Sequence, residues 1–324
     1  MAAKKSTEQF FPKIKTNHTG YLDVDDGHSM YYEECGNLKG YPILYVHGGP
    51  GGGCSTWDRR FFDPKKWRII LFDQRGAGKS RPFAETKKNT TWHLIKDMNL
   101  LLDTLGIKKT VLFGGSWGST LSLVFAINYP EKVSGMVLSG IWLADIKALE
   151  DYLSGVKHQY FPELWERFVS LVPASSRKNL CNYYYRKMTS GNKKTRKRFA
   201  YEWAYYESAM CSLQWPEESA LKKGILKSSY IDLAVLEAHY YKNKGFLKEG
   251  YIIKNATNIK KIPVSIIQGR YDAVCPPRQA WELKKALTGA KLHFVLAGHC
   301  GDTEVINKMI EETEKMYLRV TKNK

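Results

Sequence analysis

The sequence predicts an α/β protein built around a mostly parallel sheet, on three observations. Eight short runs of apolar and β-branched residues are spaced along the 324-residue chain. From the third run onward helical segments intervene, as in parallel sheets that are covered by helices on both faces. Between residues 143 and 250 this rhythm gives way to helical patterning rich in Tyr, Trp and Lys. We therefore expect a core formed by residues 1–142 and 251–324, and a helical cap formed by residues 143–250.

The first two expected strands form an antiparallel pair around the turn sequence DDGH. In chain order, the eight expected strands are Tyr21–Val24, Met30–Cys35, Ile43–Val46, Arg68–Phe72, Val111–Gly114, Met136–Ser139, Val264–Gln268 and Leu292–Leu296. Between the fourth and fifth, the sequence WHLIKDMNLLLDTLGI places its Leu and Met residues on one face of a helix that Gly106 ends. Ligands bind at the carboxyl ends of parallel strands, so an insertion over these ends is expected to act as a lid.

Composition and charge narrow the function classes. The formal net charge of +18 is spread along the chain, and the only dense basic run is Lys193–Arg198. Such a run is typical of a solvated helix face or loop, although a nuclear signal or an RNA-binding patch has the same composition. Six scattered cysteines without a C-x-x-C pair argue against a structural zinc site or a disulfide framework, and favour a cytoplasmic location.

Membrane and secretory signals are missing from the sequence. No run approaches the ~18 consecutive apolar residues of a membrane span. The N-terminal stretch MAAKKSTEQFFPKIK lacks the apolar centre of a secretory signal. We therefore expect no membrane and no nucleic-acid partner, and nothing in the sequence calls for a metal or a cofactor.

The stretch FGGSWGST, Phe113–Thr120, places Ser116 in the pattern G-x-S-x-G. This pattern is typical of a nucleophile elbow, in which a strand passes into a helix through a tight turn with the nucleophile at its apex. A Cβ atom two positions to either side would clash, so Gly114 and Gly118 fit the turn. The flanks agree, because TVLF before the motif is strand-like and STLSLVFAIN after it is helix-like as far as Pro130. Ser116 is therefore the candidate nucleophile.

A nucleophilic serine needs a base, and the base needs an acid that orients it. In a sheet of this kind the partners follow in the order Ser, acid, His, on loops after later strands. Asp272 comes just after the strand Val264–Gln268, and His299 comes just after the strand Leu292–Leu296. We expect His299 to take the proton from Ser116, and Asp272 to hold the imidazole in one tautomer and stabilise its charged form.

The glycine-rich loop YVHGGPGGG, Tyr45–Gly53, follows the third expected strand. Such a loop exposes backbone N–H groups with no side chains in the way, as an oxyanion hole requires. We assign one donor to Gly49 and the other to Trp117, the residue after the nucleophile. A phosphate-binding loop is disfavoured, because the stretch lacks both the Lys-Ser/Thr of a P-loop and the G-x-G-x-x-G pattern with a downstream acid.

Three motifs, HGGPGGG, DQRGAGKS (Asp73–Ser80) and GGSWGSTLSL, together resemble the proline iminopeptidases, also called prolyl aminopeptidases, of the α/β-hydrolase fold. The resemblance covers nearly the whole chain, and the first and third motifs are specific in combination. Members of the family usually have Cys where Ala77 stands and Arg where Lys79 stands, and these departures do not touch the triad. The resemblance implies a serine exopeptidase that releases N-terminal proline from peptides through an acyl-enzyme.

In that family, glutamates of the cap bind the free α-amine of the substrate. The family pattern W-x-x-W-E resembles WAYYE, with Trp203 kept, Tyr206 in place of the second Trp, and Glu207 in the acidic position. A second pattern, an acid followed by x-H-Y, resembles LEAHYY and gives Glu237. Two carboxylates that face one site repel each other, and a protonated amine between them relieves that repulsion. From the cap sequence alone, both glutamates would be interpreted as surface residues.

The family also surrounds the proline ring with aromatic residues and a cysteine. The resemblance assigns this pocket to Trp142, Tyr152, Tyr241 and Cys275. Trp142 and Tyr241 stand where phenylalanine is more usual, which would narrow the pocket or make it more polar. Cys275 also follows Asp272 closely, and its alternative role is that of a small buried hydrophobic residue.

Other functions stay open on the sequence alone. An esterase or amidase acting on a different acyl group would use the same triad. A catalytically dead copy that serves as a binding module is disfavoured because all three triad candidates are present. Dehalogenase and epoxide-hydrolase chemistry is disfavoured because those enzymes place Asp at the elbow. Nucleic-acid binding through Lys193–Arg198 is the alternative from another class. The oligomeric state is also open, a monomer included.

Overall fold

The computed structural model describes residues 9–153, 159–214 and 217–322. Two short parts of the expected cap lie outside the described residues. So do the first eight residues of the N-terminal stretch in which no secretory signal was found. The centre of the protein is an eight-stranded sheet with the order β1-β2-β4-β3-β5-β6-β7-β8. Its strands are β1 (Thr16–Asp23), β2 (Ser29–Gly36), β3 (Tyr41–Val46), β4 (Trp67–Phe72), β5 (Thr110–Gly115), β6 (Val133–Ser139), β7 (Val264–Gly269) and β8 (Lys291–Val295).

The sheet is parallel except at one edge. β2 pairs antiparallel with both β1 and β4, and all the other neighbouring strands pair in parallel. This confirms the predicted fold class and all eight expected strands, although β1 begins at Thr16 instead of Tyr21. One expectation was wrong: no α-helix intervenes between β3 and β4, only the 3-10 helix η1 (Asp58–Phe61). The glycine-rich loop takes up much of this connection, and glycine disfavours a helix there.

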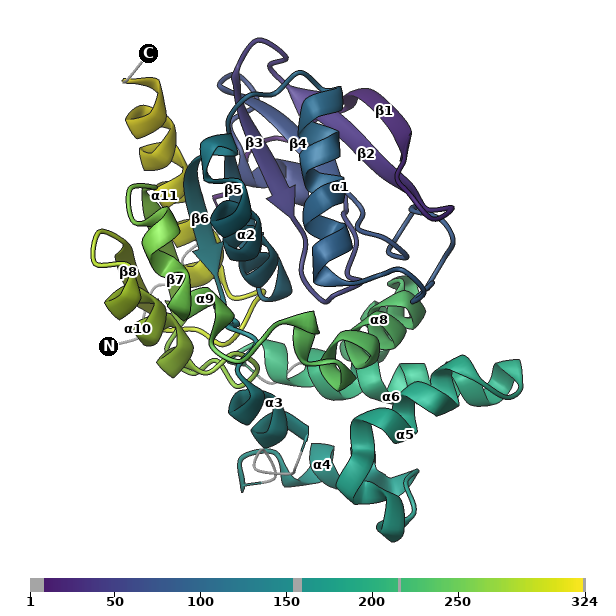
Figure 1. Ribbon diagram of the computed structural model, residues 1–324. Helices are drawn as coiled ribbons and strands as arrows, with labels where there is room; N and C mark the ends of the chain where they lie inside the picture. The colour runs from purple at the N-terminus through teal and green to yellow at the C-terminus, as the bar shows by residue number, and fades with distance from the viewer. Residues whose placement is uncertain (1–8, 154–158, 215–216, 323–324) are drawn as a thin grey trace.

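Helices cover both faces of the sheet, as expected (Figure 1). On one face, α1 (Thr91–Thr104), α2 (Trp117–Asn128) and α10 (Pro277–Ala286) share an apolar cluster with every second residue of the strands, among them Leu44, Ile70, Leu112 and Ile266. On the other face, α11 (Thr303–Thr321) shares a second cluster with the alternating set Ile43, Ile69, Val111 and Ile267. This alternation, apolar on both sides, is what a parallel sheet buried on two faces requires.

Between β6 and β7 the chain leaves the sheet and forms a helical insertion. Its helices are α3 (Ile146–Leu153), α4 (Pro162–Ser170), α5 (Leu180–Thr189), α6 (Lys193–Cys211), α7 (Glu218–Lys227) and α8 (Tyr230–Lys242), and the short α9 (Tyr251–Lys254) leads back to β7. The insertion helices gather at the end of the sheet to which the arrowheads of the parallel strands point (Figure 1). Two buried contacts attach α8 to the core: Asp232 accepts a hydrogen bond from Gly78 N (2.7 Å), and Tyr240 donates one to Asn89 Oδ1 (2.8 Å).

The basic run Lys193–Arg198 forms the first turns of α6, and its Lys and Arg side chains are exposed. Asn192 caps this helix by accepting a hydrogen bond from Thr195 N at 2.9 Å. The solvated helix face that the sequence favoured for this run is therefore confirmed. Within the described ranges, no helix has the length and apolar character that crossing a membrane demands.

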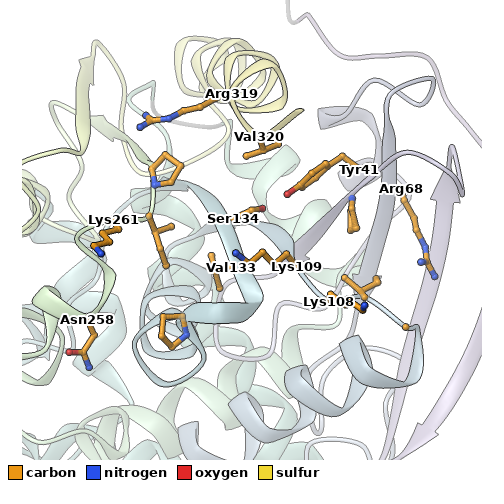
Figure 2. A pocket seen from close by; sticks show the side chains of 16 residues that line it. Tyr41, Arg68, Lys108, Lys109, Val133, Ser134, Asn258, Lys261, Arg319 and Val320 are labelled. Carbon is orange, nitrogen blue, oxygen red and sulfur yellow. The ribbon is translucent and has the colours of Figure 1, made fainter. Parts of the chain in front are cut away.

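A cavity of about 940 Å³ lies at the end of the sheet where the parallel strands begin (Figure 2). Its lining includes the labelled side chains Tyr41, Arg68, Lys108, Lys109, Val133, Ser134, Asn258, Lys261, Arg319 and Val320. None of the residues that the sequence predicts for the site lines it. The predicted site residues Ser116 and His299 lie at the opposite end of the sheet, beneath the insertion.

Candidate active site

Ser116 lies between the end of β5 and the start of α2, with φ of 57° and ψ of −127°. A non-glycine residue rarely adopts a positive φ, so the tertiary structure holds this turn in place. A Cβ atom on Gly114 would come within 2.6 Å of Gly118 O, and one on Gly118 within 2.0 Å of Val46 O. Real Cβ atoms do not approach so closely, so both positions require glycine. The strand, tight turn and helix predicted from G-x-S-x-G are all present.

The predicted acid and base are in contact. His299 Nδ1 lies 2.8 Å from Asp272 Oδ2. A carboxylate accepts hydrogen bonds, so Nδ1 carries the proton and Nε2 is left to accept one. The other carboxylate oxygen of Asp272 accepts from the backbone N–H groups of Val274 (2.9 Å) and Cys275 (2.7 Å), which fixes its orientation. Ser116 and His299 line one cavity of about 290 Å³, so the structure brings all three predicted residues together.

The environment of His299 changes its pKa in two opposing ways. Burial disfavours the charged imidazolium and lowers the pKa, whereas the adjacent Asp272 carboxylate raises it. Burial is the largest single effect, but the charge of Asp272 and the contacts with Asp272 and Cys275 together outweigh it, so the pKa of His299 lies well above its ordinary value. Burial raises the pKa of the neighbouring Cys275 thiol, so Asp272 is the group that places a negative charge beside the imidazole at neutral pH.

The predicted oxyanion donors lie on either side of the elbow. Trp117 is the first residue of α2, so its N–H has no acceptor within the helix. Gly49 has φ of +108°, and a Cβ atom there would come within 2.6 Å of Gly51 N. Its neighbour Gly48 approaches the elbow so closely that a Cβ atom on it would lie 3.4 Å from Ser116 Cβ. Gly49 and Ser116 line the same two cavities, which places the loop beside the nucleophile.

The two glutamates of the cap are buried, not exposed. The exposed fraction is 9% for Glu207 and 0% for Glu237, which excludes the surface interpretation. Trp203 Nε1 donates to Glu237 Oε2 at 2.7 Å. Burial, followed by the charge of the adjacent Glu207, raises the pKa of Glu237 well above its usual range. Glu207 lines the cavity that also holds Ser116 and His299.

The four residues assigned to the proline pocket come together. Trp142, Tyr152, Tyr241 and Cys275 are all buried, and all line a small cavity that also contains Ser116. The ring centroids of Trp142 and Tyr241 are 5.5 Å apart, and those of Tyr152 and Tyr241 are 6.1 Å apart. Ser116 therefore lies between an aromatic cavity on one side and the carboxylate-containing cavity on the other. Three apolar neighbours that the sequence did not indicate complete the aromatic cavity: Ala148, Leu149 and Val274.

Comparison with known proteins agrees with this geometry. Residues 41–301 match the family model described as "alpha/beta hydrolase fold". A proline iminopeptidase of Neisseria gonorrhoeae is 40% identical over 94% of this chain and 97% of its own length. One from Xylella fastidiosa is 40% identical over 89% of this chain and 93% of its own length. One from Arabidopsis thaliana is 39% identical over 94% of this chain and 81% of its own length.

The chain belongs to the proline iminopeptidase family of α/β hydrolases.

Solved structures show the same fold at lower identity. A proline iminopeptidase-related protein from Thermus thermophilus superposes with a TM-score of 0.59 at 21% identity, covering 94% of this chain and 97% of its own. A crystal structure reported with the carboxylesterases of Nitrososphaera gargenis gives a TM-score of 0.62 at 20% identity, covering 94% and 100%. These two likenesses establish the fold of this proline iminopeptidase family member, and its family comes from the closer sequence relatives.

Sequence reasoning missed Gln268, at the end of β7. Its side-chain amide donates to Asp272 Oδ2 (2.8 Å) and to the Cys275 carbonyl (3.0 Å), and its Oε1 accepts from Ile141 N (3.0 Å). Gln268 thereby ties the acid to the loop after β6. A glutamine at the end of an otherwise apolar strand was the only signal in the sequence.

The second motif of this proline iminopeptidase family member, DQRGAGKS, supports the oxyanion loop. Asp73 accepts from Cys54 N (2.7 Å) and Lys79 N (2.8 Å), which joins the two glycine-containing loops. Gln74 N donates to His47 Nε2 (2.9 Å), and the Gln74 side chain donates to His47 O (2.8 Å). Both residues are buried, so the backbone immediately before the glycines is held in place.

Proposed function

We propose that this chain is a serine aminopeptidase that removes proline from the free N-terminus of peptides. The observation that carries this proposal is a pair of buried carboxyl groups: Glu207 lines a cavity that contains Ser116, and Glu237 is buried against Glu207. A buried carboxylate without a counter-charge is costly. The ammonium group of a peptide N-terminus supplies that charge, whereas an ester without an amine does not.

Acyl transfer begins when Ser116 Oγ attacks the prolyl carbonyl and His299 Nε2 takes its proton. The Gly49 and Trp117 N–H groups stabilise the resulting oxyanion, and the Asp272 carboxylate stabilises the imidazolium. His299 then gives its proton to the departing amine, which leaves a prolyl ester on Ser116. Water, deprotonated by the same imidazole, attacks the ester, and the second tetrahedral intermediate collapses to release proline.

The aromatic cavity sets the identity of the first residue. Trp142, Tyr152 and Tyr241 offer flat apolar faces to a pyrrolidine ring, and the close spacing of these three rings favours proline over larger side chains. A residue attached before proline would convert the charged amine into a neutral amide. It would leave Glu207 and Glu237 without a counter-charge, so internal prolines are rejected. The enzyme is therefore an exopeptidase.

We also propose that residues 143–250 act as the lid of this site. The insertion supplies Glu207 and Glu237, while the core supplies Ser116, Asp272 and His299. The complete site needs both parts, so closure of the lid completes it. Six free cysteines fit a reducing compartment, and we propose the cytoplasm as the location.

A panel of aminoacyl arylamides tests the function. Free prolyl arylamide should be cleaved fastest, the alanyl and leucyl arylamides slowly, and N-acetyl-prolyl arylamide hardly at all. A short ester without an amine serves as a control for the chemistry at Ser116. Equal cleavage of free and acetylated prolyl substrates would contradict an aminopeptidase and favour an amidase or esterase with another acyl group.

A further inference from the structure

Helix α6 ends against the loop that carries His299. The carbonyl of Cys211, the last residue of α6, accepts hydrogen bonds from His299 N at 2.6 Å and from Cys300 N at 3.1 Å. The approach is so close that a Cβ atom on Gly298 would lie 2.7 Å from the same carbonyl oxygen. The end of a cap helix and the loop of the proposed base therefore form one packed unit.

This packing brings two cysteines together. Bond lengths alone keep the Cα atoms of hydrogen-bonded Cys211 and Cys300 within about 7 Å, near the upper end of the range that a disulfide spans. The two thiols are also close enough for each to shift the pKa of the other. Both are free, Cys300 is exposed, and both line the cavity that contains Ser116 and His299. The proposed mechanism uses neither thiol.

We propose that Cys211 and Cys300 form a redox-modification site, which low-molecular-weight disulfides of the glutathione class oxidise to a disulfide between the cap and the loop of His299. The geometry supports this because the two residues are joined through their backbones, line one cavity, and include one thiol that is open to solvent. The cytoplasm admits disulfides of this transient kind.

The two thiols differ in the way that thiol–disulfide exchange requires. A hydrogen bond from Cys211 lowers the pKa of Cys300, and the nearby His299 adds to this effect, whereas the same hydrogen bond and burial raise the pKa of Cys211. A thiol with a lowered pKa and solvent access attacks first. Cys300 is thus the attacking thiol, and Cys211 is the resolving thiol.

The exchange balances in two steps. The Cys300 thiolate, whose proton has gone to solvent, attacks one sulfur of the small disulfide; a mixed disulfide forms, and one small thiolate leaves and is protonated. Cys211 then loses its proton and attacks the sulfur of Cys300; the protein disulfide forms, and the second small thiolate leaves. Two protein thiols are oxidised, and one small disulfide is reduced to two thiols.

Oxidation is expected to slow peptide turnover. Glu207 and Cys211 are four residues apart on α6, so they share one face of the helix and line the same cavity. A disulfide from Cys211 to Cys300 ties that face to the loop of His299 and prevents the cap from lifting. It thereby hinders substrate entry and product release while leaving the proposed triad chemically intact.

The other thiols are poor competitors. Burial raises the pKa of Cys35 and of Cys181 to about 12. Cys275 is buried and lies close to the nucleophile, so its oxidation would also reduce activity. Any loss of activity must therefore be assigned to its thiol by direct mapping.

The test treats the full chain with mixtures of reduced and oxidised glutathione, alkylates the remaining thiols, and maps them by mass spectrometry while prolyl arylamide turnover is followed. We expect the wild type to lose two of its six free thiols, with Cys211 and Cys300 in one linked peptide pair, and to lose activity that dithiothreitol restores. Cys211→Ser should stop at a mixed disulfide on Cys300. Cys300→Ser should keep its own starting activity under oxidation, and Cys181→Ser should behave like the wild type.

Three outcomes would overturn the proposal. All six thiols could stay free in excess oxidised glutathione, oxidation could map first to Cys275, or a Cys211–Cys300 disulfide could form and leave turnover unchanged. The thiol map needs no substrate. It therefore tests the redox pair even if the substrate is not an N-terminal prolyl peptide.

Discussion

Glu207 on α6 and Glu237 on α8 bury their carboxyl groups against each other, on two different helices of the cap. In the described part of the chain, no other group donates a hydrogen bond to Glu207 Oε2 or Glu237 Oε1, and only a proton held between the two carboxyl groups can join them. Buried polar atoms are nearly always paired, so these two oxygens indicate a missing partner that arrives with the substrate. A cationic donor between them would satisfy both atoms and their charge.

Replacing either glutamate with glutamine tests this interpretation. Glu207→Gln and Glu237→Gln keep the shape but remove a charge, so we expect a loss of about 1–3 kcal/mol in kcat/KM for prolyl arylamide. Cleavage of a small ester without an amine should hardly change. Glu202→Gln is a matched control, because that residue lies on the same helix but pairs with Arg167. Full prolyl turnover in both glutamine variants would rule out the assignment.

Ser116→Ala should abolish turnover while leaving the fold intact. Loss of the nucleophile in a triad reduces kcat by about 10⁶, and only the oxyanion hole and binding then act on the substrate. Ser134→Ala is a suitable control, because Ser134 lines the cavity at the opposite end of the sheet. Kinetics on prolyl arylamide, together with circular dichroism, check both variants. Residual activity of more than a few per cent would mean that another residue is the nucleophile.

The rate should fall on the acid side with a midpoint above ~6.5, the ordinary pKa of histidine. His299 must be neutral to accept a proton, and its pKa is raised in the folded protein, so its cationic form persists to higher pH. Asp272→Asn removes the charge that raises this pKa, so the acid limb should move to lower pH while kcat falls by about 10⁴. Profiles of kcat/KM for both proteins measure this shift. A flat profile between about pH 5 and 8 would contradict a histidine base.

Gln268→Leu should reduce kcat more than it changes KM. The substitution removes three hydrogen bonds, to Asp272, to the Cys275 carbonyl and from Ile141 N, and leaves their partners buried, at a cost of about 1–3 kcal/mol each at most. Asp272 then loses its link to the loop after β6, and the orientation of His299 becomes less well defined. Thermal unfolding of the same variant separates a loss of stability from a loss of positioning. An unchanged kcat with a lower Tm would make Gln268 purely structural.

Gly118→Ala should destabilise the protein by about 4 kcal/mol or more, or prevent folding, because its Cβ would overlap the carbonyl of Val46. Gly224→Ala is the contrasting variant. Gly224 lies inside α7, and a Cβ atom there meets nothing within 4 Å. We expect it to stabilise the fold by about 0.5–1 kcal/mol, since alanine favours helix. Chemical denaturation of both variants measures the difference, and equal stabilities would contradict the elbow packing.

The fold could be predicted from the sequence wherever the signal was local. Strands such as β5 and β7 are short apolar runs, and the elbow is set by sterics within a few residues. The β3–β4 connection was wrongly expected to be helical, because a rule about parallel strands was applied where glycines prevent a helix. That rule states that an α-helix usually connects two parallel strands. Here the connection begins with a run of glycines, which disfavour a helix.

Residues of the site that depend on tertiary packing were harder to predict. The local sequence pattern predicted that Glu207 and Glu237 are surface residues. Only the family resemblance indicated a role for them in the site. Their burial arises because α6 and α8 pack on each other, 30 residues apart in sequence, which no local pattern encodes. Gln268 escaped notice for the same reason, since its partners lie on two other loops.

The unpaired carboxyl groups lower the free energy of unfolding of the whole protein. The pKa of Glu237 is raised in the folded protein, so above its ordinary value of 4.5 the native state holds more protons than the unfolded chain. The free energy of unfolding therefore decreases as the pH rises from about 4.5 through the folded pKa, and at neutral pH the empty site destabilises the molecule. A bound cation removes this penalty and adds its own binding free energy to that of the native state. The molecule is thus at its least stable when it has no peptide to bind.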